Sequence, residues 1–155
     1  MLTTPQLITL KALAAADQTA VVYQTEGNDV ALAEWFNAPS ATVVWRSALT
    51  PELARAAIVQ GATQLDNLTV GKRDALLFIT QGNLDVANVG VRTAIDDLCG
   101  TQNTLKTALQ ASQKRFATRA EAALSSGLGT SVSPSVMAWE GMISSQIEVP
   151  AMRGV

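Results

Sequence analysis

The sequence predicts an all-α fold, and three observations support this prediction. Capping residues repeatedly precede apolar positions that recur every three or four residues. Proline stands where helices would begin, at Pro5 and Pro51, and glycine where they would end, at Gly61 and Gly100. Hydrophobic residues form 48% of the 155-residue chain, enough for a core that needs neither disulfides nor metal. We therefore expect a helical bundle core of about five or six helices.

Three helical segments are expected in the first half of the chain. They cover residues 4–17, 28–38 and 50–61, and their candidate caps are Thr4, Asn28 or Asp29, and Thr50. Pro39 prevents the second helix from continuing far. Residues 41–46, ATVVWR, are short and rich in β-branched side chains, so a short extended segment is expected near 41–46.

Three more helices are expected in the second half. Residues 69–82 begin at a Thr69 cap and end at Gly82, and residues 85–100 begin at an Asp85 cap. The longest predicted helix covers residues 101–124. Its narrow stripe of apolar and small residues suits close helix packing and consists of Leu105, Leu109, Ser112, Phe116, Ala120 and Ala123.

The character of the chain changes after Leu124. Residues 125–134, SSGLGTSVSP, have the composition of a flexible linker. The expected organisation is thus a helical core domain over 1–124, a linker over 125–134 and an extended, strand-like interaction arm over 135–155. Deleting the arm should leave a folded helical core. The apolar residues of the arm lack a helical repeat and are the expected partner contacts: Trp139, Met142, Ile143, Ile147 and Val149.

Composition and charge narrow the class of protein. The net charge is −2, so the chain has no global basic footprint for nucleic acid. Charged residues form only 15% of the chain, which suggests that other protein covers part of its surface. The N-terminal segment lacks the pattern of a signal peptide, and no apolar run approaches the ~20 residues of a membrane span. We expect a soluble protein without membrane contact.

The residue types argue against catalysis. The chain has no histidine, which removes the commonest general base and transition-metal ligand. Cys99, the single cysteine, therefore has no histidine to activate it. The segment TVGKRDA fails as a phosphate-binding loop, because Asp66 and Arg73 stand where glycine and serine or threonine are needed. The carboxylates of Asp96 and Asp97 would point about 100° apart on a helix. No enzyme activity, cofactor or metal is expected.

Lys106, Lys114, Arg115 and Arg119 give the predicted long helix a local positive excess. These cations could pair with acidic residues of a neighbouring helix, face a protein partner or contact DNA phosphates. Arg115 and Arg119 are included among the expected partner contacts.

Several segments resemble a family of structural proteins encoded by tailed bacteriophages. They are VVWR at 43–46, LTVGKRDALLFITQGNLDVANVGVRTAIDDL at 68–98, KRFATRAEAAL at 114–124 and WEGMIS at 139–144. Members of the family similarly combine a KRDA helix, a QG turn, an NVR-like helix, an ATRAE helix and a (W/F)EG tail. Here Gly90 and Val91 stand between Val89 and Arg92, a departure from that pattern.

The resemblance implies a virion protein, most similar to the head-to-tail adaptors, also called head completion proteins. Such a protein is made in the host cytoplasm and forms a ring, commonly of about twelve copies, at the neck of the virion. Its expected partners are further copies of itself, the portal protein, and tail or neck proteins. Packaged DNA would pass through the ring without sequence-specific binding. The alternatives are a tail terminator, a capsid-decorating protein or a small helical DNA-binding regulator.

Overall fold

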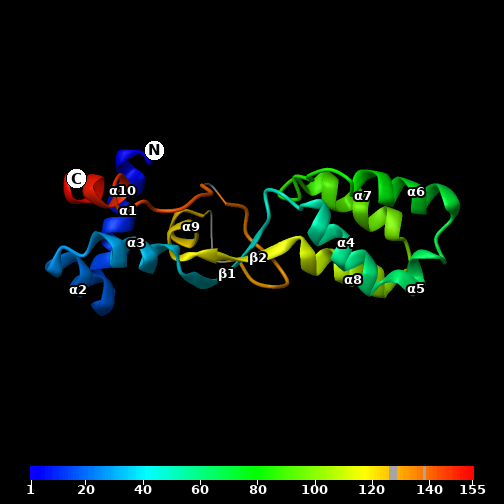
Figure 1. The fold of residues 1–155 in the computed structure, drawn as a ribbon, viewed down its shortest axis with the longest axis horizontal. Coiled ribbons are helices and arrows are strands. Elements are labelled where there is room, and N and C mark those ends of the chain that lie inside the picture. The colour runs from blue at the N-terminus through cyan, green and yellow to red at the C-terminus, as the bar shows by residue number, and fades with distance from the viewer. Residues whose placement is uncertain (126–128, 138) are drawn as a thin grey trace. The chain divides into compact units, whose positions relative to one another are not determined.

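The computed structural model describes residues 1–125, 129–137 and 139–155, and the chain divides into two compact units (Figure 1). Unit 1 consists of Met1–Val44 and Phe116–Val155, and unit 2 consists of Trp45–Arg115. The described part contains ten helices and one two-stranded sheet, so the fold is mainly α, whereas the all-α bundle of five or six helices was expected. This division differs from the single core expected over 1–124, because unit 1 contains the C-terminal segment as well as the N-terminal helices.

Unit 1 begins with three helices: α1 (Thr4–Ala15), α2 (Gln18–Glu26) and α3 (Asp29–Asn37). The N-cap of α1 is Thr3, one residue before the predicted one. Helix α2 was not predicted; the Asp17 side chain caps it by accepting hydrogen bonds from Thr19 N and Ala20 N. Gly27 ends α2 at a φ of 71°, in the left-handed region that favours glycine.

Two helices from the end of the chain complete unit 1: α9 (Arg119–Leu124) and α10 (Glu148–Arg153). Both pack on α1, and both also contact α3. The two chain termini therefore lie in the same unit, and the Lys11 ammonium donates a hydrogen bond to the Val155 carbonyl (Figure 1). Arg153 forms an ion pair with Asp29 at the start of α3.

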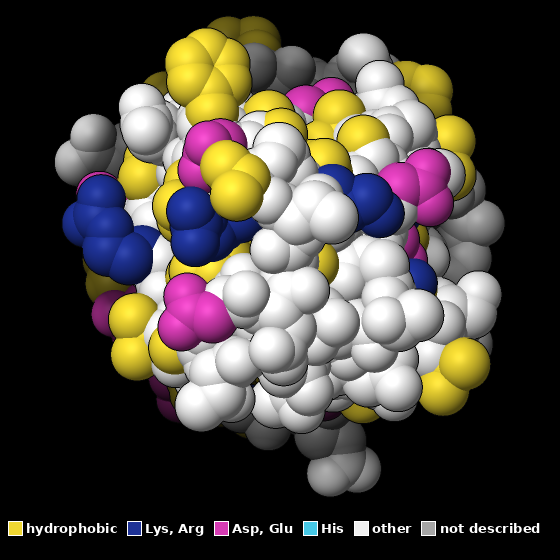
Figure 2. Space-filling model, turned by 90° about the vertical axis from the view of Figure 1, so that its right-hand side faces the viewer, with side chains coloured by type: hydrophobic (Ala, Val, Ile, Leu, Met, Phe, Trp, Pro, Cys, Tyr) yellow, Lys and Arg dark blue, Asp and Glu magenta, His cyan; other side chains and the backbone are white. Residues whose placement is uncertain are grey.

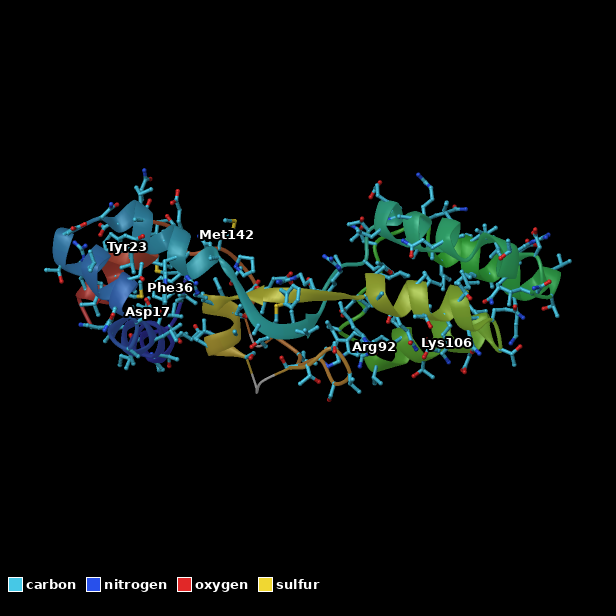
Figure 3. All side chains as sticks on the ribbon, turned by 90° about the horizontal axis from the view of Figure 1, so that it is seen from below. Asp17, Tyr23, Phe36, Arg92, Lys106 and Met142 are labelled. Atoms are coloured by element: carbon cyan, nitrogen blue, oxygen red, sulfur yellow. The ribbon has the colours of Figure 1, made fainter. Side chains whose placement is uncertain are left out.

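The core of unit 1 draws on both ends of the sequence. Phe36 is fully buried, and its ring meets that of Trp35 edge to face with centroids 5.0 Å apart. Figure 3 shows Phe36 and Tyr23 within this group of helices. The other buried members come from α1, α2, α3, α9 and the C-terminal segment: Leu2, Leu7, Leu10, Ala14, Ala20, Leu32, Ala33, Ala120, Ile143, Val149 and Met152.

The prediction of an extended arm over 135–155 is wrong for the last third of this segment. Residues 148–153 form helix α10, and Val149 and Met152 on this helix are buried in the unit 1 core. Just before the helix, Ile143 is only 3% exposed and is fixed by two hydrogen bonds with Asn37. Ile143 N donates to Asn37 Oδ1 at 2.7 Å, and Asn37 Nδ2 donates to Ile143 O at 2.9 Å. These apolar residues escape water within their own chain.

The predicted linker is held to the fold in its described part. Residues 126–128 of this segment, like Ala138 further on, lie outside the described residues. Gly129 accepts a hydrogen bond from Val43 N at 3.0 Å, and Ser135 N donates to Val43 O at 3.1 Å. Ser135 also forms a parallel bridge with Val44. Residues 129–135 therefore add backbone pairing beside strand β1, which a free spacer would not do.

The sheet pairs β1 (Pro39–Trp45) with β2 (Lys114–Thr118). Hydrogen bonds from Arg46 N to Gln113 O and from Arg119 N to Ala38 O mark opposite ends of an antiparallel pair. Strand β1 confirms the extended segment expected near 41–46. Strand β2 shows that the single helix predicted over 101–124 is wrong, because residues 114–118 gain a strand partner that the sequence pattern does not reveal.

Unit 2 contains α4 (Pro51–Gln60), α5 (Ala62–Leu65), α6 (Val70–Ile79), α7 (Val89–Cys99) and α8 (Asn103–Ser112). Thr50 and Thr69 accept hydrogen bonds from Leu53 N and Lys72 N, so the caps predicted for α4 and α6 are confirmed. Helix α7 is capped by Asn88 instead of the predicted Asp85. The buried core consists of Leu49, Ala54, Ala57, Ile58, Leu76, Val86, Ile95, Cys99, Leu105 and Leu109.

Candidate interaction surface

Trp45 contacts two cationic side chains within unit 2. The Arg92 guanidinium is 4.0 Å from the centroid of the indole ring, and the Lys114 ammonium is 5.4 Å from it. Arg92 also donates hydrogen bonds of 2.7 Å to the carbonyls of Val86 and Ala87. Cation–π attraction and hydrogen bonds thus join residues of three segments that carry the phage resemblance: VVWR, NVGVR and KRFATRAE.

Replacing Arg92 with alanine is expected to destabilise unit 2 by about 1–3 kcal/mol, because the variant loses the indole contact and two charge-assisted hydrogen bonds. Hydrogen exchange of amides in α7 and α8 measures this loss. Arg73→Ala is the control: among the described residues Arg73 forms an ion pair only with its neighbour Asp74, at 3.7 Å, and the two side chains are 37% and 65% exposed. The control should stay within about 0.5 kcal/mol of the parent protein; equal losses in both variants would contradict a role for the Trp45 contact.

A buried carboxylate joins two further motifs inside unit 1. Glu121, only 3% exposed, accepts a hydrogen bond from Thr118 N at 2.9 Å and one from Gly141 N at 3.4 Å. The first completes a capping box at the start of α9. A Cβ on Gly141 would come 2.8 Å from the Trp139 ring, and its φ of 158° also disfavours other residues. The ATRAE and WEG motifs therefore stabilise the same corner of the fold.

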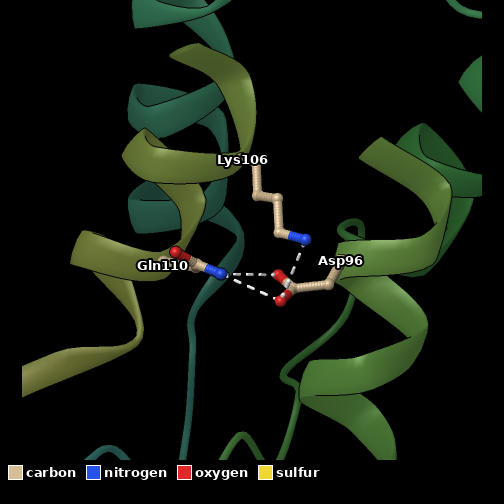
Figure 4. A network of polar contacts seen from close by, with 3 residues as sticks. All are labelled: Asp96, Lys106 and Gln110. Carbon is tan, nitrogen blue, oxygen red and sulfur yellow. Dashed lines mark hydrogen bonds and ion pairs between the residues drawn. The ribbon is translucent and has the colours of Figure 1, made fainter. Parts of the chain in front are cut away.

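Polar contacts also fix α7 against α8. Asp96 accepts hydrogen bonds from Gln110 Nε2 at 2.8 and 3.1 Å, and the Lys106 ammonium lies 3.5 Å from the same carboxylate (Figure 4). Lys106, one of the cations that give residues 101–124 a local positive excess, thus pairs with an acidic residue of the neighbouring helix α7. Figure 2 shows one face of the molecule on which Lys and Arg side chains lie beside Asp and Glu, without a patch of single charge.

Cys99 is fully buried at the end of α7. Burial and, to a smaller extent, the nearby Asp96 carboxylate together raise the pKa of its thiol to about 11, against a smaller lowering by Lys106 and Lys72. Since the thiolate is the reactive form, only about one thiol in a thousand is ionised at pH 8.

Alkylation of Cys99 with iodoacetamide at pH 8 is therefore expected to be at least about 100-fold slower in the folded than in the urea-unfolded protein. The folded rate should rise as the pH approaches 11. Mass spectrometry of the labelled protein gives both rates. Equal rates in the two states would contradict the buried position.

The five predicted contacts of the C-terminal segment divide into three kinds. Ile143 and Val149 are wrong as partner contacts, because they are buried in the core of unit 1. Trp139 is half-buried and packs against that core. Met142 and Ile147 are 73% and 52% exposed, and Figure 3 shows Met142 at the surface. These last two remain available to a partner.

The two predicted arginines lie at the strand and the helix that follows it. Arg119 holds its guanidinium 4.7 Å from the Trp35 ring centroid and donates a hydrogen bond to the Trp35 carbonyl at 3.0 Å. Its contacts are thus within unit 1. Arg115 is half-buried on β2.

A groove on unit 2 was not foreseen from the sequence. It has a volume of about 290 Å³ and lies between α4 and α6. Its lining combines apolar side chains with one cation and polar groups: Pro51, Arg55, Ile58, Leu77, Thr80 and Gln81. Leu77 is 38% exposed, and the next residue on α6, Phe78, is 73% exposed. We call this feature the α4–α6 groove. The spacing of Pro51, Arg55 and Ile58 along α4 could have indicated a shared helix face. The sequence does not reveal that α4 packs beside α6.

The groove carries an arginine that is not engaged elsewhere. Arg55 is exposed and forms no hydrogen bond or ion pair with any residue that the structure describes. Its electrostatic neighbour is Glu52, whose pKa is lowered mainly by hydrogen bonds from its own backbone and from Thr50, and less by Arg55. The other cations of unit 2 have contacts within the chain.

Within the described ranges, no group of three or more His, Cys, Asp or Glu side chains is placed to hold a metal ion. None of the described helices combines the length and hydrophobicity that a membrane crossing requires. No protein-family model, no curated protein and no solved structure matches the chain.

Proposed function

We propose that this protein is a structural component of a tailed-bacteriophage virion. In this proposal it is a head-to-tail adaptor that works by assembly, with several copies forming a ring between the portal and the tail. Each of its two units is then a small helical bundle that presents a binding surface. The protein would be made in the host cytoplasm and reside at the neck of the virion.

One observation carries this proposal: the segments that resemble the phage family contact one another. Trp45 meets Arg92 and Lys114 in unit 2, and Glu121 meets Gly141 in unit 1. These residues therefore support the fold. A shared set of fold-supporting residues is what a structural family would have in common, so the contacts favour the resemblance over a coincidence of short motifs.

The surface of each unit also suits a protein that is covered by partners. Apolar side chains more than half exposed include Phe78 and Val59 in unit 2, and Met142, Ile147 and Val30 in unit 1. Charged residues form only 15% of the chain. An exposed apolar side chain next to few charges gains most from burial against another protein. We assign Met142 and Ile147 to contacts with the portal protein or a neighbouring tail or neck protein.

Counting copies in the virion tests the proposal. Quantitative mass spectrometry of purified particles, scaled to the portal subunit, should give about twelve copies of this protein per virion. Hundreds of copies would assign it to the capsid surface instead. Absence from the particle, together with a salt-sensitive affinity for duplex DNA, would favour a regulatory protein and contradict the adaptor.

A further inference from the structure

We propose that the α4–α6 groove of unit 2 binds the acidic face of α2 and α3 in unit 1 of a second copy of this chain. This inference rests on the proposed ring and specifies its subunit contact. We use the name acidic face for the exposed side chains of Val22 and Glu26 on α2 and of Val30 and Glu34 on α3, two helices that contact one another.

The two units carry opposite net charges. Unit 1 contains three Lys and Arg against seven Asp and Glu, a net charge of −4, whereas unit 2 contains eight against six, a net charge of +2. Two copies therefore attract one another most strongly when unit 1 of one approaches unit 2 of the other. Like units would repel.

Charged side chains without a hydrogen bond or ion pair to the described residues lie both on the acidic face of unit 1 and in the groove of unit 2. In unit 1 the three cations are engaged within the unit: Lys11 with Val155, Arg119 with Trp35, and Arg153 with Asp29. Glu26 and Glu34 are exposed and form no hydrogen bond or ion pair with the described residues. In unit 2 the cation without such a contact is Arg55, in the groove. Arginine pairs well with a carboxylate at a protein interface.

The apolar side chains of the acidic face also complement those of the groove. Val22 precedes Glu26 by four residues, and Val30 precedes Glu34 by four, so each helix presents a valine and a carboxylate on one face. The two valines are 49% and 60% exposed. In the groove, Arg55 stands beside the apolar side chains of Ile58 and Leu77. A valine on the apolar floor would bring its carboxylate toward the arginine.

The contact joins two different surfaces of the same chain. Such a heterologous contact repeats from copy to copy and closes into a ring when the rotation per subunit permits it. The proposed adaptor requires this geometry, whereas a two-fold symmetric contact would stop at a dimer.

Charge reversal tests the subunit contact with the full-length protein. Native mass spectrometry and sedimentation velocity would compare the parent protein, the groove variant Arg55→Glu and the face variant Glu26→Lys/Glu34→Lys. We expect each variant alone to weaken self-association at least about tenfold. The variant that combines all three substitutions should associate again, because the charges are opposite once more. Arg73→Glu, on the same unit outside the groove, is the matched control and should associate like the parent.

Mixing the two single-surface variants adds a second readout. The intact groove of the face variant fits the intact acidic face of the groove variant, and the reversed groove fits the reversed face, as in the combined variant. The mixture should therefore form assemblies that contain the two variants in a one-to-one ratio and reach the size of the parent's, whereas each variant alone should not. Normal association of Arg55→Glu, absence of rescue in the combined variant, or a parent protein that stays monomeric would each overturn this contact. The copy number per virion tests the adaptor role separately, so a failed contact is distinguishable from a failed function.

Discussion

Deletion of residues 135–155 is expected to unfold unit 1 and to leave unit 2 folded, in place of the intact helical core over 1–124 expected from the sequence. The deletion removes Ile143, Val149 and Met152, which are 3%, 0% and 2% exposed in the core formed with α1 and α3. Burial of three such side chains contributes on the order of 5–9 kcal/mol. That amount approaches the entire stability of a typical domain. Among the residues that the structure describes, none beyond Leu109 belongs to the buried core of unit 2, so the amides of unit 2 should keep their protection.

Hydrogen exchange with mass spectrometry measures both units in one experiment. We expect amides of α1, α2 and α3 to exchange rapidly in the deletion variant, while those of α4 and α8 remain slow. Two point variants provide a matched pair. Ile143→Ala should destabilise unit 1 by about 2–5 kcal/mol, whereas Met142→Ala, at an exposed neighbouring position, should stay within about 0.5 kcal/mol. Retained protection of α1 after the deletion would show that the C-terminal segment is a free arm.

Gly61→Ala is expected to destabilise unit 2 by about 1–3 kcal/mol, because the new methyl group overfills a close helix contact. Gly61 follows α4 and lies against α8. A Cβ at this position would come 2.5 Å from the Leu105 Cα and 2.7 Å from its Cβ. Backbone is on one side of this contact, so the neighbouring helix would have to move. Urea unfolding of unit 2, followed by hydrogen exchange of α8, measures the loss.

The same substitution at Gly71 serves as the control and should have the opposite sign. A Cβ on Gly71 meets no atom within 4 Å, and the residue lies in the first turn of α6. Alanine is a better helix former than glycine, so Gly71→Ala should stabilise unit 2 by about 0.5 kcal/mol. Equal effects of the two substitutions would contradict the close approach of α4 and α8.

Local signals allowed much of the helical structure to be predicted. Threonine caps followed by proline or apolar residues correctly located α4 and α6, and Gly100 correctly marked the end of α7. These signals work because a cap or a stop acts within one turn of the helix. The β-branched run before Trp45 likewise predicted a strand. Helix α2 was missed because Val21 and Val22 are exposed, and Ala20 and the partly buried Tyr23 alone leave no clear apolar stripe.

The errors concern interactions between residues far apart in the sequence. Residues 114–118 continue the helical spacing of Leu105 and Leu109, yet they form β2 because β1 supplies a partner some seventy residues earlier. The C-terminal segment has no periodic pattern, but Ile143 finds Asn37 and the core of unit 1. Tertiary pairing overrides local propensity in both places.

The candidate surface could be predicted only in part. Met142 and Ile147 were predicted as contacts and are exposed, whereas Ile143 and Val149, of the same chemical type, are buried. Sequence alone does not distinguish an apolar side chain that meets its own core from one that meets a partner. The α4–α6 groove arises from the packing of two helices, so Arg55 carries no local sign of its role.

A reconstruction of the virion neck by electron microscopy tests self-assembly at the head-to-tail junction most directly. We expect a ring of about twelve copies of this chain between the portal and the tail. In that ring the α4–α6 groove of each copy should be covered by α2 and α3 of its neighbour. A neck in which all density belongs to other proteins, with this chain on the capsid surface or missing from the particle, would contradict the proposed function.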